Sequence, residues 1–312
     1  MAAPAPAKPF RLGTRRSPLA MAQAEEARAR LCAAHGWAAD AVELVPVTAS
    51  GDRIQDRALA DIGGKALWTR ELDACLADGR IDAAVHSLKD VETLRPESLI
   101  IAAVLPRADK ADVLLGALTV EALPQGATIG TSAPRRAAQL LNRRPDCEVV
   151  LFRGNVATRM AKLAAGEVQA TFLAAAGLER LGETGVGTRL DPAQWLPAPS
   201  QAAIGIECRA DDIRARDWLT GIDHAPSHAE VVAERAMLAA LGGSCHSAVA
   251  CLSLWEGDRL HLSAAIFSPD GGERIAGEAR FDPRDAAGPQ ALARELLARA
   301  PESVRATFQP PA

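Results

Sequence analysis

Short apolar runs alternate with amphipathic segments through most of the chain. Runs rich in Val, Ile, Leu and Ala predict buried strands, and apolar residues spaced three and four apart predict helices. The clearest helix covers residues 17–34, because Ser17 can cap it, Pro18 suits its first position and Gly36 ends it. This alternation is typical of an α/β domain with a mostly parallel sheet.

Two such α/β units follow one another. The first is expected to hold strands over residues 10–14, 42–48, 81–87 and 99–105, with a second helix over residues 66–78. The second restarts at Asp112, with strands over residues 127–131, 147–152 and 169–173 and helices over residues 134–143, 156–165 and one ending at Arg180. A proline-rich stretch, residues 190–201, then precedes an apolar strand over residues 203–207.

The C-terminal part has a different pattern. A helix near residues 229–241 leads through the turn GGSCHS to strands over residues 248–255, 259–267 and 273–281 and a helix around residues 289–298. Their spacing favours antiparallel hairpins. We therefore expect two doubly wound α/β domains and a small α+β C-terminal domain.

Composition and charge restrict the function classes. The 312 residues, 48% of them hydrophobic and 24% charged, suit an ordinary globular protein of about two domains. The net charge of −4 argues against nucleic acid or an anionic membrane surface as a partner. No apolar run reaches the ~18 residues of a membrane span. The segment MAAPAPAKPF is expected to be a disordered tail and not a signal peptide, and a cytoplasmic location follows.

The six cysteines show no CxxC spacing and lie far apart, which favours reduced thiols over a disulfide framework or a zinc site. No HExxH or Cys/His cluster predicts a catalytic metal, and no GxxxxGK[ST] or GxGxxG loop predicts a nucleotide site. Cys245 lies in the glycine-rich turn, so we expect it to be more accessible than Cys32 or Cys75 on helices. A lone cysteine in a turn does not by itself define an attachment site.

Three strand-to-helix turns carry arginines, namely residues 14–17, residues 131–136, and residues 153–155 with Arg159 one helical turn later. Helix N-termini attract anions, and arginine binds carboxylates through a planar fork. Together these turns predict a ligand with several negative groups in a cleft between the two α/β domains. For any single arginine, pairing with a surface carboxylate is the alternative.

Asp90, in HSLKDV, follows a predicted strand and is the candidate acid, where a carboxylate can steady a cation and move protons. Its alternative is a structural ion pair with Lys89 or an arginine. His86, on the apolar strand itself, is expected to be a hydrogen-bonded structural residue.

Several segments together resemble the porphobilinogen deaminase family, from about residue 10 to the C-terminal helix. They are GTRRSPLAMAQA, GGKALWTREL, DAAVHSLKDV, IGTSAPRRAAQL, FRGNVATRMAKL, AAAGLERLG, AIGIECR and ERAMLAALGGSC, in the family's order and spacing. HSLKDV, RGNVATR and the glycine-flanked cysteine are jointly very specific.

The resemblance implies a three-domain enzyme whose first two domains are similar to type II periplasmic binding proteins. Domain 1 would comprise residues 10–105 and 203–221, domain 2 residues 106–202, and domain 3 residues 222–312. The family's cofactor is a dipyrromethane, joined by a thioether to the cysteine that matches Cys245. On this primer four porphobilinogen molecules condense with loss of ammonia, and water then releases hydroxymethylbilane. A monomer is implied.

The resemblance also implies roles for single residues. Asp90 would be the catalytic carboxylate. Contacts to the primer would come from Ser17, Lys89, Asp90, Ser132, Arg135 and Arg136. Substrate and growing chain would be held by Arg15, Arg153 and Arg159, with Gln23 and Gln201 as polar support. Residues 49–65 predict a mobile loop, often a lid at this length, and the resemblance adds Lys65 and Trp68 to it.

The chain departs from the family's usual pattern at three places, one of which is Gly242, where a common acidic residue before the cysteine loop is replaced. Ala133-Pro134 stands in place of Ser-Leu and removes a hydroxyl, and PSQAAIG replaces VGQGAIG. Two other functions stay open. A polyanion-binding protein without turnover would need only the first two domains, and a thiol acyl-transfer enzyme would use Cys245 with His246.

Overall fold

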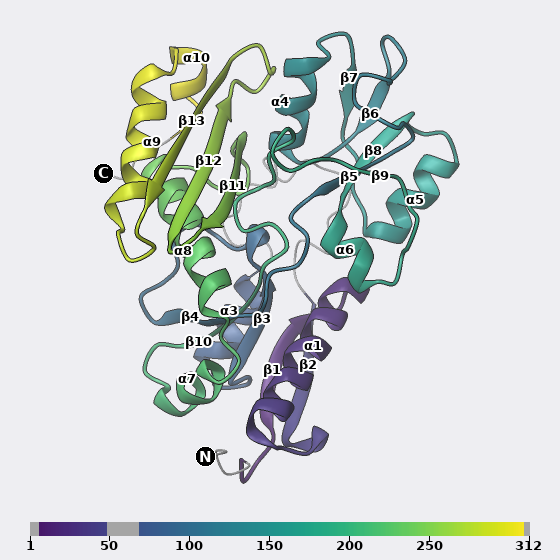
Figure 1. The fold of residues 1–312 in the computed structure, drawn as a ribbon. Helices are drawn as coiled ribbons and strands as arrows, with labels where there is room; N and C mark the ends of the chain where they lie inside the picture. Colours follow the sequence, from purple (N-terminus) through teal and green to yellow (C-terminus); the bar gives the residue numbers. More distant parts are fainter. Residues whose placement is uncertain (1–5, 49–68, 309–312) are drawn as a thin grey trace. The chain divides into compact units, whose positions relative to one another are not determined.

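The computed structural model describes residues 6–48 and 69–308. These residues divide into two compact units (Figure 1). The first unit contains the described residues up to 108 together with residues 202–228, and the second contains residues 109–201 and 229–308. Lys65, Trp68 and the predicted loop over residues 49–65 lie outside the described residues.

The first unit is built on a five-stranded sheet of order β2-β1-β3-β10-β4. Its strands are β1 (Phe10–Arg15), β2 (Val42–Val47), β3 (Ala83–Ser87), β4 (Leu99–Val104) and β10 (Ile204–Arg209). β1 is parallel to β2 and β3, whereas β10 is antiparallel to β3 and β4. The strand predicted after the proline-rich stretch therefore belongs to the first sheet.

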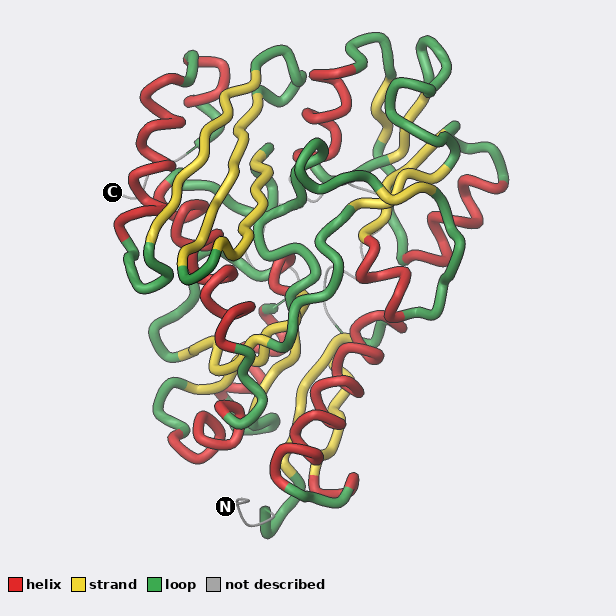
Figure 2. Tube along the Cα trace, viewed as in Figure 1, coloured by secondary structure: helices red, strands yellow, loops and turns green. Residues whose placement is uncertain are grey.

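Helices cover both faces of this sheet, as expected for a doubly wound domain. They are α1 (Pro18–His35), α3 (Arg70–Ala77) and α7 (Ile213–Thr220), with the short 3₁₀ turns η1 (Ala39–Ala41) and η2 (Leu88–Asp90). Leu31 of α1 and Leu219 of α7 share one core with Leu12 and Val85, while Leu72 of α3 packs on the opposite face with Ala84. Figure 2 shows α1 alongside β1 and β2.

The caps of α1 confirm the sequence prediction. Ser17 is the N-cap in an extended conformation, and its hydroxyl accepts a hydrogen bond from the amide of Ala20 at 3.3 Å. Pro18 occupies the first turn, and Gly36 ends the helix with a φ of 67°. A left-handed residue at this position is accessible to glycine without steric cost, so Gly36 sets the end of the helix.

The second unit contains a sheet with the same pattern, of order β7-β6-β8-β5-β9. Its strands are β5 (Asp112–Leu115), β6 (Thr128–Gly130), β7 (Glu148–Val150), β8 (Ala170–Ala174) and β9 (Thr188–Arg189). Its helices are α4 (Pro134–Arg143), α5 (Val156–Ala164) and α6 (Ala175–Arg180). β5 and β9 were not predicted.

The expectation of mostly parallel sheets is confirmed for the strand directions, because four of the five strands in each sheet run the same way and only β10 or β5 is reversed. In each five-stranded sheet, two pairings are parallel and two are antiparallel. The antiparallel strands β10 and β5 pair with strands that are distant from them along the chain, β3 and β8 respectively. No βαβ crossover connects these pairs, so the parallel direction is not imposed on β10 and β5.

The second unit also carries a three-stranded antiparallel sheet, β11-β12-β13. Its strands are β11 (Val249–Glu256), β12 (Arg259–Phe267) and β13 (Arg274–Phe281), and the helices that follow the second sheet are α8 (Ala225–Ala240), α9 (Ala287–Arg299) and α10 (Glu302–Arg305). Met237, Leu292 and Leu296 pack on one face. On the other face Ala138 of α4 joins Ala265 and Phe267 in a shared core.

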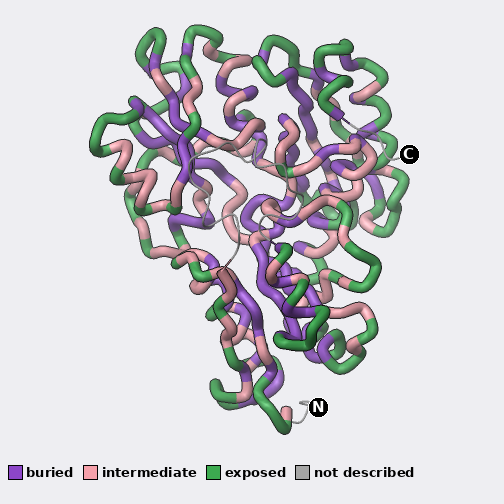
Figure 3. Tube along the Cα trace, turned by 180° about the vertical axis from the view of Figure 1, so that it is seen from behind, coloured by how far each residue is buried: buried purple, intermediate pink, exposed green. Residues whose placement is uncertain are grey.

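The α/β fold class with a small α+β C-terminal part is thus confirmed, and the three-domain boundaries stay a prediction. Buried positions follow the strands and the inner helix faces (Figure 3). Within residues 6–48 and 69–308, no helix has both the length and the apolar character needed to cross a membrane.

Candidate functional site

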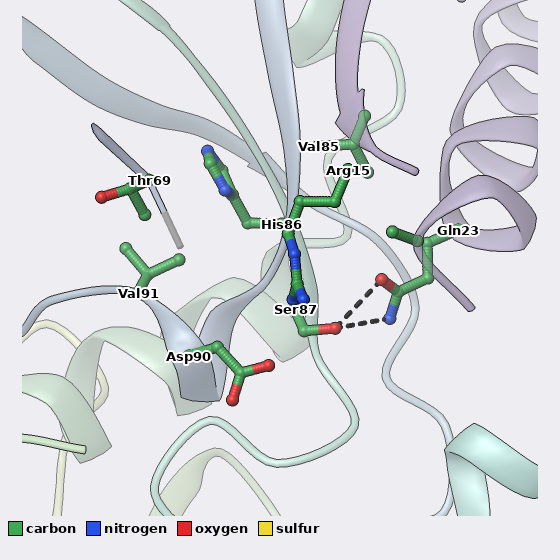
Figure 4. A pocket seen from close by; sticks show the side chains of 9 residues that line it. Arg15, Gln23, Thr69, Val85, His86, Ser87, Asp90 and Val91 are labelled. Atoms are coloured by element: carbon green, nitrogen blue, oxygen red, sulfur yellow. Dashed lines mark hydrogen bonds between the residues drawn. The ribbon is translucent and has the colours of Figure 1, made fainter. Parts of the chain in front are cut away.

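A pocket lies at the carboxyl ends of β1 and β3 in the first unit (Figure 4). It is lined by Arg15, Ala20, Gln23, Thr69, Val85, His86, Ser87, Asp90 and Val91. Three predicted site residues, Arg15, Gln23 and Asp90, therefore share one pocket. Ligands of open α/β sheets bind at this end of the strands, so the location agrees with the sequence prediction.

Asp90 lies in η2, directly after β3. The amide of Leu88 donates to the carbonyl of Ala203 at 3.0 Å, which fixes the start of η2 against the segment before β10. The Asp90 side chain is half-buried, and within the described part of the chain its carboxylate has no hydrogen bond or ion pair. The alternative of a structural ion pair with Lys89 or an arginine is thus not realised among these residues, and the carboxylate can receive a ligand.

Gln23 and Ser87 both line the pocket and are hydrogen-bonded to each other. The amide nitrogen of Gln23 donates to Ser87 Oγ at 2.8 Å, and that hydroxyl donates back to Gln23 Oε1 at 3.0 Å (Figure 4). Ser17 is engaged as the cap of α1. Lys89 is half-buried beside Asp90 in η2.

In the second unit, Arg135 and Arg136 converge on the buried carboxylate of Asp112. Arg135 Nη1 lies 2.8 Å from Asp112 Oδ2, and Arg136 Nη2 lies 2.7 Å from Oδ1. Burial raises the pKa of Asp112, but the two guanidinium groups outweigh this effect and hold it well below its usual range. Asp112 is therefore ionised, and the three groups together carry one net positive charge.

Gln201 and Trp195 complete this buried network. Gln201 Nε2 donates to Asp112 Oδ1 at 3.0 Å, and Trp195 Nε1 donates to Oδ2 at 2.9 Å. Arg135 Nη1 and Arg136 Nη1 donate to the carbonyls of Leu196 and Phe172. The Nε atoms of both arginines are buried and have no hydrogen-bond partner among the described residues.

The other predicted residues of the second unit lie at the neighbouring strand ends. Ser132 Oγ donates to the carbonyl of Phe152 at 2.9 Å and so joins the turn after β6 to the turn after β7. Arg153 follows in the second turn and is buried. Arg159 Nε donates to the carbonyl of Gly154 at 2.9 Å.

Cys245 lies in the turn between α8 and β11 and is exposed, whereas Cys75 is buried and Cys32 is half-buried. The prediction that Cys245 is the more accessible thiol is confirmed. Hydroxyl groups fix the turn, since Ser244 N donates to Ser247 Oγ at 3.0 Å and His246 N donates to Ser244 Oγ at 3.2 Å. Part of the turn thus holds a defined conformation around an accessible thiol.

Sequence reasoning missed Asp112, Trp195, Thr69 and Ser87. The one available signal was Asp112 itself, an acid at the start of the apolar run DVLL, where an unpaired charge is not tolerated. In the described ranges, no group of three or more His, Cys, Asp and Glu side chains is placed to hold a metal ion.

Comparisons with known proteins were made for the sequence and for the structure. The family model described as porphobilinogen deaminase, dipyromethane cofactor binding domain, matches residues 10–217, and that described as porphobilinogen deaminase, C-terminal domain, matches residues 228–298. The porphobilinogen deaminase of Sphingopyxis alaskensis is 58% identical over 309 residues, which cover 97% of this chain and 98% of that protein. That of Paracoccus denitrificans is 50% identical over 302 residues, or 96% of both.

Solved structures similar to this chain include the VFT2 domain of Bordetella pertussis BvgS, with a TM-score of 0.40 and 16% identity over 72% of this chain and 91% of that domain. Another is the ligand-binding component of an ABC-type import system from Staphylococcus aureus, with a TM-score of 0.40 and 13% identity over 74% of this chain and 73% of that protein.

Proposed function

Because the chain belongs to the porphobilinogen deaminase family, we propose that it condenses four porphobilinogen molecules head to tail on a covalently bound dipyrromethane primer. Each condensation releases ammonia, and hydrolysis then releases the linear tetrapyrrole hydroxymethylbilane. The chain is accordingly a transferase of porphyrin, and hence heme, biosynthesis. The observation that carries the proposal is the half-buried Asp90 carboxylate, which lines a pocket together with Arg15 and Gln23.

The residues present fit a dipyrromethane. Its attachment requires an accessible thiol, and Cys245 is exposed in a turn held by hydroxyl groups. Its acetate and propionate groups require cationic donors. The Arg135 and Arg136 side chains, with Asp112, keep a net positive charge, and their two Nε groups have no hydrogen-bond partner in the described part of the chain. The residues that would hold it are Cys245, Ser17, Lys89, Asp90, Ser132, Arg135 and Arg136.

When bound, the dipyrromethane supplies the pyrrole carbon to which the first substrate is joined. Arg15, Arg153 and Arg159 bind carboxylates of the incoming substrate and of the growing chain, with Gln23 and Gln201 as polar support. Ser87 orients the Gln23 amide through two hydrogen bonds, so little rotational freedom is lost when substrate arrives.

Asp90 performs the proton transfers. The aminomethyl group of porphobilinogen leaves as ammonia, and the Asp90 carboxyl assists protonation of that amine. The same group, as a carboxylate, then stabilises the cation left on the substrate and accepts the ring proton that is lost after coupling. The Asp90 carboxylate can serve all three steps, because it gives up no ion pair with any residue in the ranges 6–48 and 69–308.

The direct test is the denaturing intact mass of the purified protein and of Cys245→Ser, with Cys32→Ser as a matched cysteine control. We expect a mass excess of one dipyrromethane in the wild type and in Cys32→Ser and none in Cys245→Ser. If the wild type stays bare even after incubation with porphobilinogen, the proposal is wrong and binding without turnover is favoured. The monomeric state and the cytoplasmic location stay predictions.

A further inference from the structure

A cluster of charged side chains, together with one threonine, adjoins the Asp90 pocket in the interior of the first unit. We call it the Arg95 clamp, and its members are Thr69, Asp73, Glu92, Arg95 and Glu207. Arg95 Nε and Nη2 donate to the two carboxylate oxygens of Glu207 at 2.9 and 2.8 Å. Arg95 Nη2 also reaches Asp73 at 2.6 Å, and Nη1 reaches Glu92 at 2.8 Å. The Arg95 side chain is 9% exposed and that of Glu207 is 0% exposed, so this is an interior network.

The clamp joins three parts of the first unit. Glu207 lies in the middle of β10, Asp73 lies in the first turn of α3, and Glu92 and Arg95 lie in the segment that follows η2. One planar guanidinium with several donors can satisfy three carboxylates at once, which the single ammonium of a lysine cannot do in the same geometry.

Asp90 lies between two fixed points of this unit. On its N-terminal side, β3 and the bond from Leu88 N to Ala203 O hold the backbone. On its C-terminal side, Glu92 and Arg95 are held by the clamp. Because the Asp90 carboxylate has no partner of its own among the described residues, its position is set by its backbone, and the clamp fixes one side of that backbone.

The clamp also forms part of the pocket wall. Thr69 lines the pocket, and its hydroxyl donates to Glu92 Oε2 at 2.7 Å. His86 lines the pocket too, with Nε2 at 3.3 Å from Glu207 Oε2. Burial raises the pKa of Glu207, but His86 and Arg95 outweigh it and lower the pKa to about 2. Glu207 is therefore ionised at neutral pH and keeps Arg95 in place.

We propose that Arg95 is a positioning residue for Asp90, holding the segment after η2 so that the carboxylate points into the pocket. This inference rests on the proposed function. Its physical basis is that a misplacement of a reacting group by about 1 Å can lower the rate about a hundredfold without removing any binding group. The loss of Arg95 would therefore lower kcat and leave the groups that bind substrate carboxylates unchanged.

The test compares Arg95→Met, Arg95→Lys and Glu92→Gln with the wild type, using protein whose primer loading is measured by intact mass. Rates are expressed per folded and loaded molecule. We expect kcat of Arg95→Met to fall about 10- to 100-fold with KM for porphobilinogen within about twofold. Arg95→Lys should recover part of that loss, because it keeps the charge but not the fork.

Arg11→Met is the matched control, since Arg11 also joins two parts of this unit through a carboxylate, that of Asp82, at 3.1 and 2.9 Å. It lies at the start of β1, away from the pocket-lining residues, so its kcat should stay that of the wild type. Wild-type kcat in Arg95→Met would overturn the positioning role.

Should Arg95→Met not fold, Glu92→Gln decides. It removes one carboxylate of the clamp two residues from Asp90, and an unchanged kcat there would likewise overturn the proposal. A wild-type protein that makes no tetrapyrrole would overturn the proposed function and this inference together, whereas active variants beside an active wild type would overturn the inference alone.

Discussion

The two five-stranded sheets share one strand pattern, but the clusters of charged side chains around their buried acids have net charges of opposite sign. Each has an antiparallel strand with a fully buried carboxylate, Glu207 on β10 and Asp112 on β5. Asp112 is paired with two arginines. Glu207 shares its arginine with Asp73 and Glu92, so three carboxylates face one guanidinium.

The difference follows the chemistry proposed for each unit. A positive excess around Asp112 suits the carboxylates of a pyrrole chain, whereas a negative excess behind Asp90 suits the cation that forms when ammonia leaves. The same arrangement of strands thus supports two opposite electrostatic environments. What separates them is the number of arginines that reach the buried acid.

The largest expected effect comes from Asp90, the acid that has no hydrogen bond or ion pair to another described residue. Asp90→Asn should retain the fold and lower kcat about 10²- to 10⁴-fold, since it removes the proton-transferring group and no structural bond. Steady-state rates and circular dichroism check this, with Asp78→Asn as an exposed control in the same unit. Turnover near the wild-type rate would remove Asp90 from the proposed mechanism.

The acid of the second unit should instead govern stability. Asp112→Asn leaves Arg135 and Arg136 buried with no compensating charge, so the free energy of unfolding should fall by about 3–5 kcal/mol. Urea denaturation measures it. Asp109→Asn, which breaks a more exposed pair with Arg189, should cost far less. Equal losses in both variants would contradict the distinction drawn between buried and exposed pairs.

Glu207 should make the free energy of unfolding depend on pH in the acidic range. Its pKa is about 2 in the folded chain against an ordinary value of 4.5, so it stabilises the fold above pH ~4.5 and loses that contribution as the pH falls toward ~2. The shift corresponds to about 3 kcal/mol. Unfolding free energies of wild type and Glu207→Gln, measured from pH 6 downward, should converge in that window. A constant difference would show that the carboxylate does not titrate there.

Glycine in the turn before β10 should stabilise the fold. Ser200 and Ala202 have φ of 61° and 68°, the left-handed region that disfavours side chains, and these are positions where PSQAAIG departs from the glycines of VGQGAIG. Ala202→Gly should raise the free energy of unfolding by about 1 kcal/mol. The same change one residue later, Ala203→Gly, should lower it, because Ala203 has no positive φ. Thermal denaturation compares the stability of the two variants. If both were more stable than the wild type, backbone strain at Ala202 would be ruled out as the cause.

The smallest effect concerns the two proline-started helices. Ser17 caps α1 with its hydroxyl, whereas the N-cap of α4 is Ala133, in an extended conformation and with no side-chain hydrogen bond. Ala133→Ser should add about 0.5–1 kcal/mol of stability, and Ser17→Ala should remove about as much. Urea midpoints suffice for the measurement. No gain from Ala133→Ser would indicate that Pro134 already fixes the helix start.

Local patterns predicted the elements wherever a short-range signal existed. Ser17, Pro18 and Gly36 set the bounds of α1, and residues 134–143 form α4 as expected. The strands β5 and β9 and the helices α7 and α10 were missed. The site residues at strand ends, Arg15 and Asp90, were predictable, since strand ends meet at one edge of a sheet. The acids that pair with Arg135, Arg136 and Arg95 were not predicted, because Asp112 and Glu207 are distant along the chain from the arginines they bind.

The sequence alone determined most of the secondary structure, the accessibility of Cys245 and the family, since each depends on neighbouring residues or on motifs in a fixed order. Only the tertiary structure decided that β10 lies antiparallel between β3 and β4, that Arg135 and Arg136 share a buried acid, and that Arg95 ties the segment after Asp90 to β10 and α3. These long-range pairs depend on which arginine lies within reach of which buried carboxylate once the sheets have formed. That choice is made by burial and geometry, which a linear pattern does not contain.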